Sequence, residues 1–177
     1  MVQIMGSIFE CKCKKCGYEF CSFVGAGVTY PIDYCEMVKK MKEGEFGQQG
    51  KKFFETFPNG AITCKNIVVQ CKDCKNLMTV PELALYIPKE GYDPAKMNRN
   101  IPWTIGFSAK EYDYIAPNEL EKNYDFLEYY EHRCTKCSGH TSVVPGFTER
   151  RNGDTDRYVE CPECGSMMEI RMTGKWD

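Results

Sequence analysis

Four Cys-x-x-Cys motifs are the residues of this chain whose type and spacing point to a definite chemistry. Each motif places two thiolates on one short turn, and two such turns together complete a tetrahedral metal site. Four motifs therefore predict two metal sites per chain, and zinc is the metal that a closed shell of four thiolates favours. The eight expected ligands are Cys13, Cys16, Cys71, Cys74, Cys134, Cys137, Cys161 and Cys164.

The spacing between the motifs favours pairing of neighbours along the chain. Residues 138–160 separate the last two motifs, slightly more than the roughly 15–20 residues of such zinc sites, and a hairpin loop absorbs the difference. Residues 17–70 separate the first two motifs, and two helices can fill this gap. We therefore expect one site from the first two motifs and another from the last two. The alternative joins the first motif to the last and requires long loop closures.

Short strands and three helices are expected to position the motifs. Apolar residues recur at helical spacing over 31–43, and phenylalanines give a second helix over 48–57 an apolar side. Asn118 and Glu121 resemble a capping box, which predicts a third helix over 119–131. Residues typical of strands occupy 8–10, 18–23, 61–69, 77–80, 141–144, 158–160 and 167–172.

These elements predict an α+β fold with three consecutive parts. Residues 1–80 form an N-terminal module with a helical insertion at about 31–57, and residues 132–177 form a C-terminal module. Residues 81–131 connect them, first through a segment rich in proline and aromatic residues and then through the third helix. Each module is a small antiparallel sheet whose limited core needs a metal to fold.

Two of the motifs resemble the knuckles of the zinc-ribbon and rubredoxin-like superfamily. They read Cys13-Lys14-Lys15-Cys16-Gly17-Tyr18 and Cys161-Pro162-Glu163-Cys164-Gly165. The resemblance covers the knuckles and adjoining strands, and it implies two zinc-ribbon modules in which all eight motif cysteines are ligands. In that superfamily two knuckles hold zinc or, in rubredoxins, a single iron.

The chain departs from the rubredoxin pattern in two respects. A rubredoxin joins these two types of knuckle in one short domain, whereas here they fall in different expected modules. Lys75 follows Cys74 and Ser138 follows Cys137, where knuckles usually carry glycine. Both departures favour structural zinc, with iron as the alternative metal.

Several cysteines and histidines lie outside the motifs. Cys35 is expected in the apolar side of a helix, as a small core residue. Cys11 and Cys64 are expected near the first site, either as buried thiols or as a redox-sensitive pair. His132 and His140 flank the third motif and are expected at a surface or a sheet edge, because four thiolates already complete the site.

Composition and charge exclude several classes of protein. The formal net charge is −2 and the pI about 5.8, so the chain lacks the dominant basic stripe of a generic nucleic-acid binder. No apolar run approaches the roughly 20 residues of a membrane span, and residues 1–6 lack the features of a signal peptide. We therefore expect a cytoplasmic protein, in which paired cysteines bind metal.

The function expected from the sequence is that of a non-enzymatic, zinc-binding adaptor that binds another protein. No hydrolase, phosphate-loop or metalloprotease motif is present, and a complete four-cysteine shell leaves no open position for catalysis. The aromatic residues expected at the binding surface are Trp103, Phe107, Tyr112 and Tyr114. One alternative is electron transfer through iron. Another is nucleic-acid binding through Arg150, Arg151, Arg157, Arg171 and Lys175.

Overall fold

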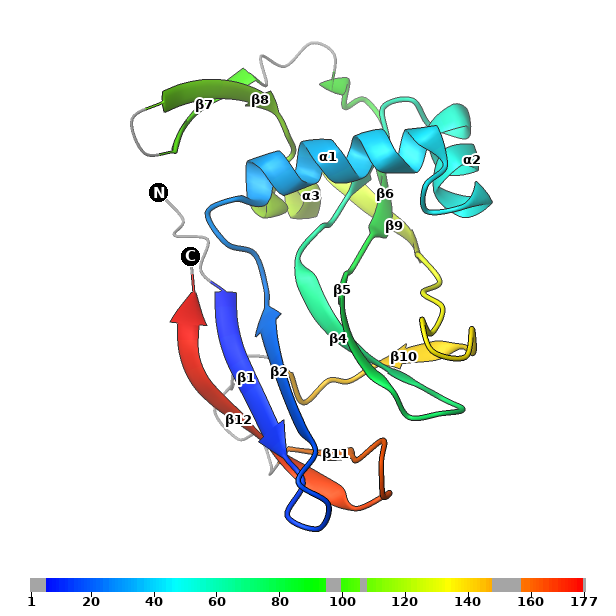
Figure 1. The fold of residues 1–177 in the computed structure, drawn as a ribbon. Coiled ribbons are helices and arrows are strands. Elements are labelled where there is room, and N and C mark those ends of the chain that lie inside the picture. Colours follow the sequence, from blue (N-terminus) through cyan, green and yellow to red (C-terminus); the bar gives the residue numbers. More distant parts are fainter. Residues whose placement is uncertain (1–5, 95–99, 106–107, 148–156, 177) are drawn as a thin grey trace. The chain divides into compact units, whose positions relative to one another are not determined.

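Strands that are far apart in the sequence pair with one another and divide the chain into two units, each built from separate segments. The computed structural model describes residues 6–94, 100–105, 108–147 and 157–176, with side chains left undescribed at 100–112. Unit 1 comprises Met1–Val28, Lys65–Pro81 and Glu131–Asp177, and unit 2 comprises Thr29–Cys64 and Glu82–Tyr130. The α+β class with small antiparallel sheets is confirmed (Figure 1). The compact units differ from the three consecutive parts expected, because strands far apart in the sequence pair with one another.

The larger sheet of unit 1 joins the two ends of the described chain. Its strands are β1 (Gly6–Lys12), β2 (Glu19–Val24), β11 (Tyr158–Glu160) and β12 (Met167–Trp176), in the antiparallel order β11-β12-β1-β2. The long strand β12 lies beside β1 in Figure 1. The first motif is the turn between β1 and β2 and the last is the turn between β11 and β12, so the antiparallel pairing of β1 with β12 brings both motifs to the same end of the sheet.

The second sheet of unit 1 contains β4 (Asn66–Cys71), β5 (Leu77–Pro81) and β10 (Thr141–Val143), in the order β10-β4-β5. The β4–β5 hairpin contributes to two separate apolar clusters, because successive strand residues point to opposite faces. Val68 and Leu77 pack in the cluster that contains Cys13 and Cys161. The adjacent residues of the hairpin pack in a second cluster: Val69 and Met78, with Cys71 and Cys134. One hairpin therefore supports the surroundings of all four motifs.

The helices of unit 2 agree with two of the three expected. Helix α1 spans Tyr30–Glu43 and ends at Gly44, whose φ of 84° and N–H bonds to Lys40 and Met41 close the last turn. Helix α2 spans Gln48–Thr56. The third expected helix, over 119–131, is wrong in its second half.

Helix α3 spans only Pro117–Asn123, and the chain continues as strand β9 (Tyr124–Tyr129). The predicted capping box at Asn118 is wrong, because Ala116 is the N-cap and Pro117 lies in the first turn. Strand β9 pairs with β6 (Ala84–Pro88), and these interstrand hydrogen bonds override the helical spacing of the local sequence.

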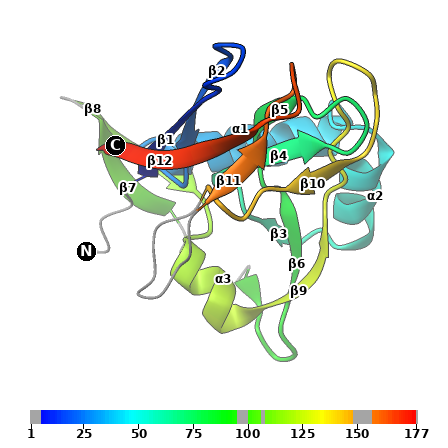
Figure 2. The same ribbon diagram turned by 90° about the horizontal axis from the view of Figure 1, so that it is seen from below.

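The sheet of unit 2 has the order β3-β6-β9, with β3 at Ala61–Ile62 (Figure 2). A separate hairpin is formed by β7 (Asn100–Ile105) and β8 (Ser108–Asp113). The segment after residue 81, in which the sequence indicated no regular element, therefore holds three strands. Among the described residues, every helix is too short or too polar to cross a membrane.

Candidate metal centres

The cysteines of the four motifs converge in two groups, both within unit 1. In each group the four sulfur atoms lie within 4.8 Å of one another. Site A consists of Cys13, Cys16, Cys161 and Cys164. Site B consists of Cys71, Cys74, Cys134 and Cys137.

The distances between sulfur atoms fit a tetrahedral ion. A metal at the Zn–S distance of about 2.3 Å places its sulfur ligands roughly 3.8 Å apart. The Sγ–Sγ distances include 3.4 Å for Cys13–Cys164, 3.6 Å for Cys16–Cys161, 3.5 Å for Cys71–Cys137, 3.6 Å for Cys74–Cys134 and 3.4 Å for Cys137–Cys74. These separations are far longer than the roughly 2.05 Å of a disulfide, and the residues present can hold one metal ion at each site.

The expected pairing of neighbouring motifs is wrong. The first motif joins the last in site A, and the two middle motifs join in site B. Strand pairing explains both: β1 pairs with β12, and β10 pairs with β4. The long loops that this arrangement closes add little cost, because the closure free energy rises only by about 0.6 kcal/mol for each doubling of loop length.

All four motifs adopt the same turn. In each, the N–H of the first cysteine donates to the carbonyl five residues further on. These bonds run from Cys13 to Tyr18 (2.8 Å), Cys71 to Asn76 (2.9 Å), Cys134 to Gly139 (2.9 Å) and Cys161 to Ser166 (2.8 Å). The turn buries the first cysteine of each motif, whereas Cys16 and Cys137 are exposed. A chelator or alkylating reagent therefore reaches each site from the side of a second cysteine.

The residue after each motif has a left-handed backbone. The φ angles are 79° at Gly17, 59° at Lys75, 59° at Ser138 and 72° at Gly165. Glycine adopts this conformation freely, whereas other residues lose roughly 1–2 kcal/mol. Site A therefore has two glycine knuckles, and site B forms two knuckles at the expense of strain at Lys75 and Ser138.

Hydrogen bonds and crowding divide the thiols of site A into two classes. The side chain and backbone of Ser166 hydrogen-bond Cys164 and lower the pKa of its thiol to about 6. The backbone of Tyr18 lowers the pKa of Cys16, but desolvation and the neighbouring sulfurs outweigh it and raise that pKa to about 12. Several thiolates so close together repel one another unless a cation lies between them.

Site B shows the same division. Desolvation acts to raise the pKa of Cys134, but hydrogen bonds that include one from the backbone of Cys137 lower it to about 6. The backbone of Gly139 lowers the pKa of Cys137, whereas the sulfurs of Cys74 and Cys71 raise it to about 12. Each site therefore combines at least one thiol of lowered pKa with one of raised pKa, and a cation bound between the sulfurs would favour ionisation of the second near neutral pH.

Two of the remaining cysteines, Cys11 and Cys64, are buried and have raised pKa values. Cys11 is buried in the cluster around site A, and desolvation raises its pKa to about 11. Cys64 is buried in unit 2 beside Tyr30, and desolvation raises its pKa to about 12. A protonated, buried thiol is a poor nucleophile, so both residues fit the structural reading offered by the sequence. Cys35 is half-buried on α1 and donates to the Asp113 carbonyl.

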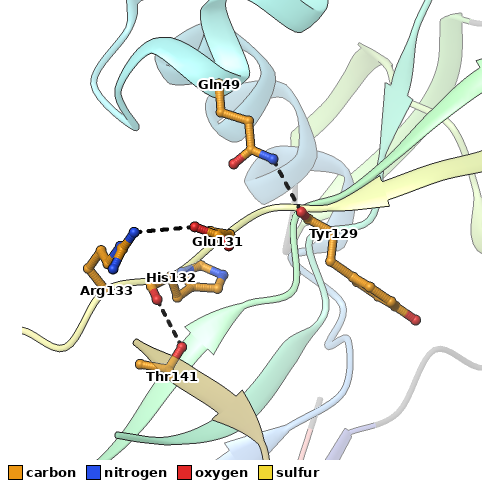
Figure 3. A network of polar contacts seen from close by, with 6 residues as sticks. All are labelled: Gln49, Tyr129, Glu131, His132, Arg133 and Thr141. Atoms are coloured by element: carbon orange, nitrogen blue, oxygen red, sulfur yellow. Dashed lines mark hydrogen bonds and ion pairs between the residues drawn. The ribbon is translucent and has the colours of Figure 1, made fainter. Parts of the chain in front are cut away.

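The two histidines contribute their backbones to site B. Arg133 and His140 form an isolated β-bridge next to the third motif, and the His140 carbonyl accepts from the N–H of Lys72 (2.9 Å). The His132 carbonyl accepts a bond of 2.9 Å from the hydroxyl of Thr141 (Figure 3). Within the described part of the chain, neither imidazole belongs to a metal-ligand group.

Of the four aromatic residues expected at a binding surface, the structure describes the side chain of Tyr114. Tyr114 is buried, at 6% exposure. Phe107 lies outside the described residues, as do the side chains of Trp103 and Tyr112.

A different aromatic cluster is exposed in unit 2, and we call Tyr86, Phe126 and Tyr129 the aromatic patch. Phe126 is 50% exposed and Tyr129 61% exposed, and their ring centroids lie 4.8 Å apart. The Phe126 ring also meets Tyr86 edge-on at 5.8 Å. Figure 3 shows the Tyr129 carbonyl accepting from Gln49 (3.2 Å) while its ring points away from that bond. The patch was missed from the sequence because β9 was read as helix.

Of the five basic residues expected to bind nucleic acid, two are paired, two lie outside the described residues and one is exposed. Arg171 forms an ion pair with Glu169 at 2.6 Å, and Arg157 donates to the Gly146 carbonyl at 3.2 Å. Arg150 and Arg151 lie outside the described residues. Lys175 is exposed on β12.

An open depression of about 820 Å³ lies over the exposed face of the larger sheet, where charges of both signs meet. Lys12 pairs there with Glu19, and Arg171 with Glu169. Paired charges attract phosphate weakly, so this face gives the nucleic-acid alternative no support.

Comparisons of the chain with protein-family models, with curated proteins and with solved structures found no match.

Proposed function

We propose that this chain is a cytoplasmic, zinc-binding adaptor without enzymatic activity, whose two sheets in unit 1 are zinc-ribbon modules. The observation that carries the proposal is the convergence of four sulfur atoms within 4.8 Å at each of two sites. Zinc bound there would supply a rigid link between strands. Four thiolates fill its tetrahedral shell and leave no position for a substrate or a reactive water.

The aromatic patch of unit 2 is the surface on which a protein partner would dock. Exposed aromatic residues are enriched at the centres of protein interfaces, where they bury a large area at a small entropic cost. Strand β9 is also an edge strand in the order β3-β6-β9, and edge strands offer backbone groups to a partner.

The metal content of the purified chain tests the zinc part of the proposal. Elemental mass spectrometry is expected to give two zinc ions per chain in a colourless sample. A chain purified without chelator that holds no metal would contradict the proposal.

A matched pair of variants tests the adaptor part. Phe126→Ala removes the centre of the aromatic patch, and Tyr158→Ala removes an aromatic residue of similar exposure (49%) from unit 1. Proteins that co-purify with the wild type and with Tyr158→Ala, but not with Phe126→Ala, would support docking at the patch. Identical sets of proteins in all three samples would contradict it.

A second candidate function, electron transfer by iron at site A, is favoured by one observation. The Cys-x-x-Cys-Gly-Tyr knuckle that ends at Tyr18 pairs with the Cys-Pro-x-Cys-Gly knuckle that ends at Gly165. Their separation in the expected modules was the first argument against a rubredoxin-like site, and the structure removes it. Site B retains the second departure, at Lys75 and Ser138.

Absorption spectroscopy separates the two functions. One iron per chain, with visible absorption that disappears on reduction, would assign electron transfer to site A and leave zinc to site B. Two zinc ions per chain and no visible absorption would exclude electron transfer by iron at site A.

A further inference from the structure

Gln70 is bonded to one knuckle of each metal site. It precedes Cys71 on β4, and its side-chain nitrogen donates to the carbonyl of Lys75 at 3.0 Å and to the carbonyl of Glu160 at 2.8 Å. Lys75 directly follows Cys74 of site B, and Glu160 directly precedes Cys161 of site A. A primary amide has two N–H donors, so both bonds form at the same time.

The strand that carries Gln70 presents a different face to each site. Gln70 pairs with Leu77, whose side chain belongs to the cluster around Cys13 and Cys161. The next residue, Cys71, belongs to the cluster around site B. The side chain of Gln70 therefore extends from the hairpin that builds site B toward the strand that enters site A.

The carbonyl that Gln70 holds in site B belongs to a strained residue. Lys75 has a φ of 59°, a conformation that the closed knuckle imposes. When metal leaves site B, repulsion between the thiolates opposes the knuckle that the Cys71 N–H bond to the Asn76 carbonyl closes, and Lys75 relaxes toward ordinary backbone angles. Its carbonyl then moves, and the amide of Gln70 loses the bond that orients it toward Glu160.

An ion pair between the same two residues adds little to this link. Lys75 Nζ lies 3.4 Å from Glu160 Oε2, but the two side chains are 41% and 39% exposed. Ion pairs at such exposure contribute about 0–1 kcal/mol. The part-buried hydrogen bonds of the Gln70 amide are the stronger candidate for a connection between the two knuckles.

We propose that Gln70 couples the two sites, so that metal bound at either site strengthens binding at the other. This inference rests on the proposed function in that both sites must bind metal. Coupling of this kind is reciprocal, and couplings between sites typically change affinity about 5–150-fold. We expect a factor at the lower end of this range, because a single side chain carries it.

Zinc competition against a chromophoric chelator measures the coupling on the full chain. Cys74→Ser with Cys137→Ser empties site B, and Cys16→Ser with Cys164→Ser empties site A. The product of the two stepwise affinities of the wild type, divided by the product of the two single-site affinities, gives the coupling factor. We expect a factor of about five or more, and a factor of one would overturn the proposal.

The role of Gln70 is tested by the same measurement in a Gln70→Leu background. We expect the coupling factor to fall toward one, because leucine cannot donate to either carbonyl. Gln48→Leu makes the same change at an exposed position of α2 and is expected to leave the factor unchanged. If Gln70→Leu does not fold, Gln70→Met keeps an unbranched side chain without the donor. A factor that persists in the Gln70 variant would overturn the proposal.

The two proposals fail in different ways. Fewer than two zinc ions in the wild type would overturn the proposed function and the coupling with it. Two zinc ions bound independently would overturn the coupling alone.

Discussion

The sulfur of Cys13 lies 3.4 Å from the sulfur of Cys164, although the two residues are 151 positions apart in the sequence. A metal at site A therefore closes a loop that contains almost the whole chain. The free-energy cost of closing a loop grows slowly with its length, so the pairing of β1 with β12 is sufficient to bring these motifs together.

Replacement of one buried ligand should abolish site A. Cys161 is 1% exposed, and Cys161→Ser is expected to lower the zinc content from two ions per chain to one. The larger sheet of unit 1 should also lose stability, because metal binding and folding are linked. Elemental analysis and thermal unfolding check both effects. Cys21→Ser, at an exposed position of β2, is the control, and equal zinc content in both variants would refute the ligand assignment.

Glycine at the strained positions of site B should stabilise the protein. Lys75→Gly and Ser138→Gly each relieve a left-handed backbone at a non-glycine residue. We expect a gain of about 1 kcal/mol for each, seen as a higher midpoint in denaturant unfolding. Lys72→Gly, which lacks a positive φ, is the control and is expected to give no gain. Lower stability in both site B variants would show that the strain is not released.

Trp176 leaves no room for a side chain at Gly27. A Cβ added at Gly27 would overlap the ring of Trp176, whose Nε1 donates to the Val24 carbonyl at 3.2 Å. Gly27→Ala is therefore expected to cost about 1–3 kcal/mol through overpacking, measured by denaturant unfolding. At Gly174 an added Cβ meets Ile8 at 3.5 Å, an ordinary contact. Gly174→Ala is the matched control, and equal losses in both variants would argue against the Trp176 contact.

Unit 2 should lose stability in alkali through Cys64. Burial raises the pKa of this thiol from 9.0 to about 12, so the folded state keeps the proton that the unfolded chain releases. The free energy of unfolding is therefore unaffected by this thiol below about pH 9, and it falls as the pH rises from 9 toward 12. At pH 10.5 the decline amounts to about 2 kcal/mol.

Cys64→Ala removes the thiol that releases a proton when the chain unfolds in alkali. Its free energy of unfolding should fall less steeply between pH 8.5 and 10.5 than that of the wild type, as measured by urea denaturation. Cys21→Ala, at an exposed thiol, should keep the slope of the wild type. Parallel curves for the wild type and Cys64→Ala would show that Cys64 ionises equally in both states.

Local signals were sufficient to predict the two helices that begin unit 2 and the cysteines that converge in two groups. They were insufficient for the pairing of the motifs, since partners across a sheet are chosen by contacts that one sequence does not display. The weight given to loop length was also misplaced, because closure cost depends only logarithmically on length. The Gly17-Tyr18 and Pro162 signatures pointed to the pairing observed in site A.

The prediction of the third helix was wrong for a related reason. Residues 124–129 satisfy a helical pattern locally, but they form the edge strand of a sheet in which β6 is their partner. The exposed aromatic patch follows from that strand and could not be found without it.

The discontinuity of unit 1 sets an order for its assembly during translation. Site B has all its ligands once Cys137 has left the ribosome, and unit 2 is complete at Tyr130. Site A waits for Cys164, so the thiols of Cys13 and Cys16, made first, are the last to be joined by their partners. Until Cys164 has been synthesised, the thiols of Cys13 and Cys16 stay accessible to oxidants and competing metals. The first motif to be translated is therefore the one most exposed to oxidation during synthesis.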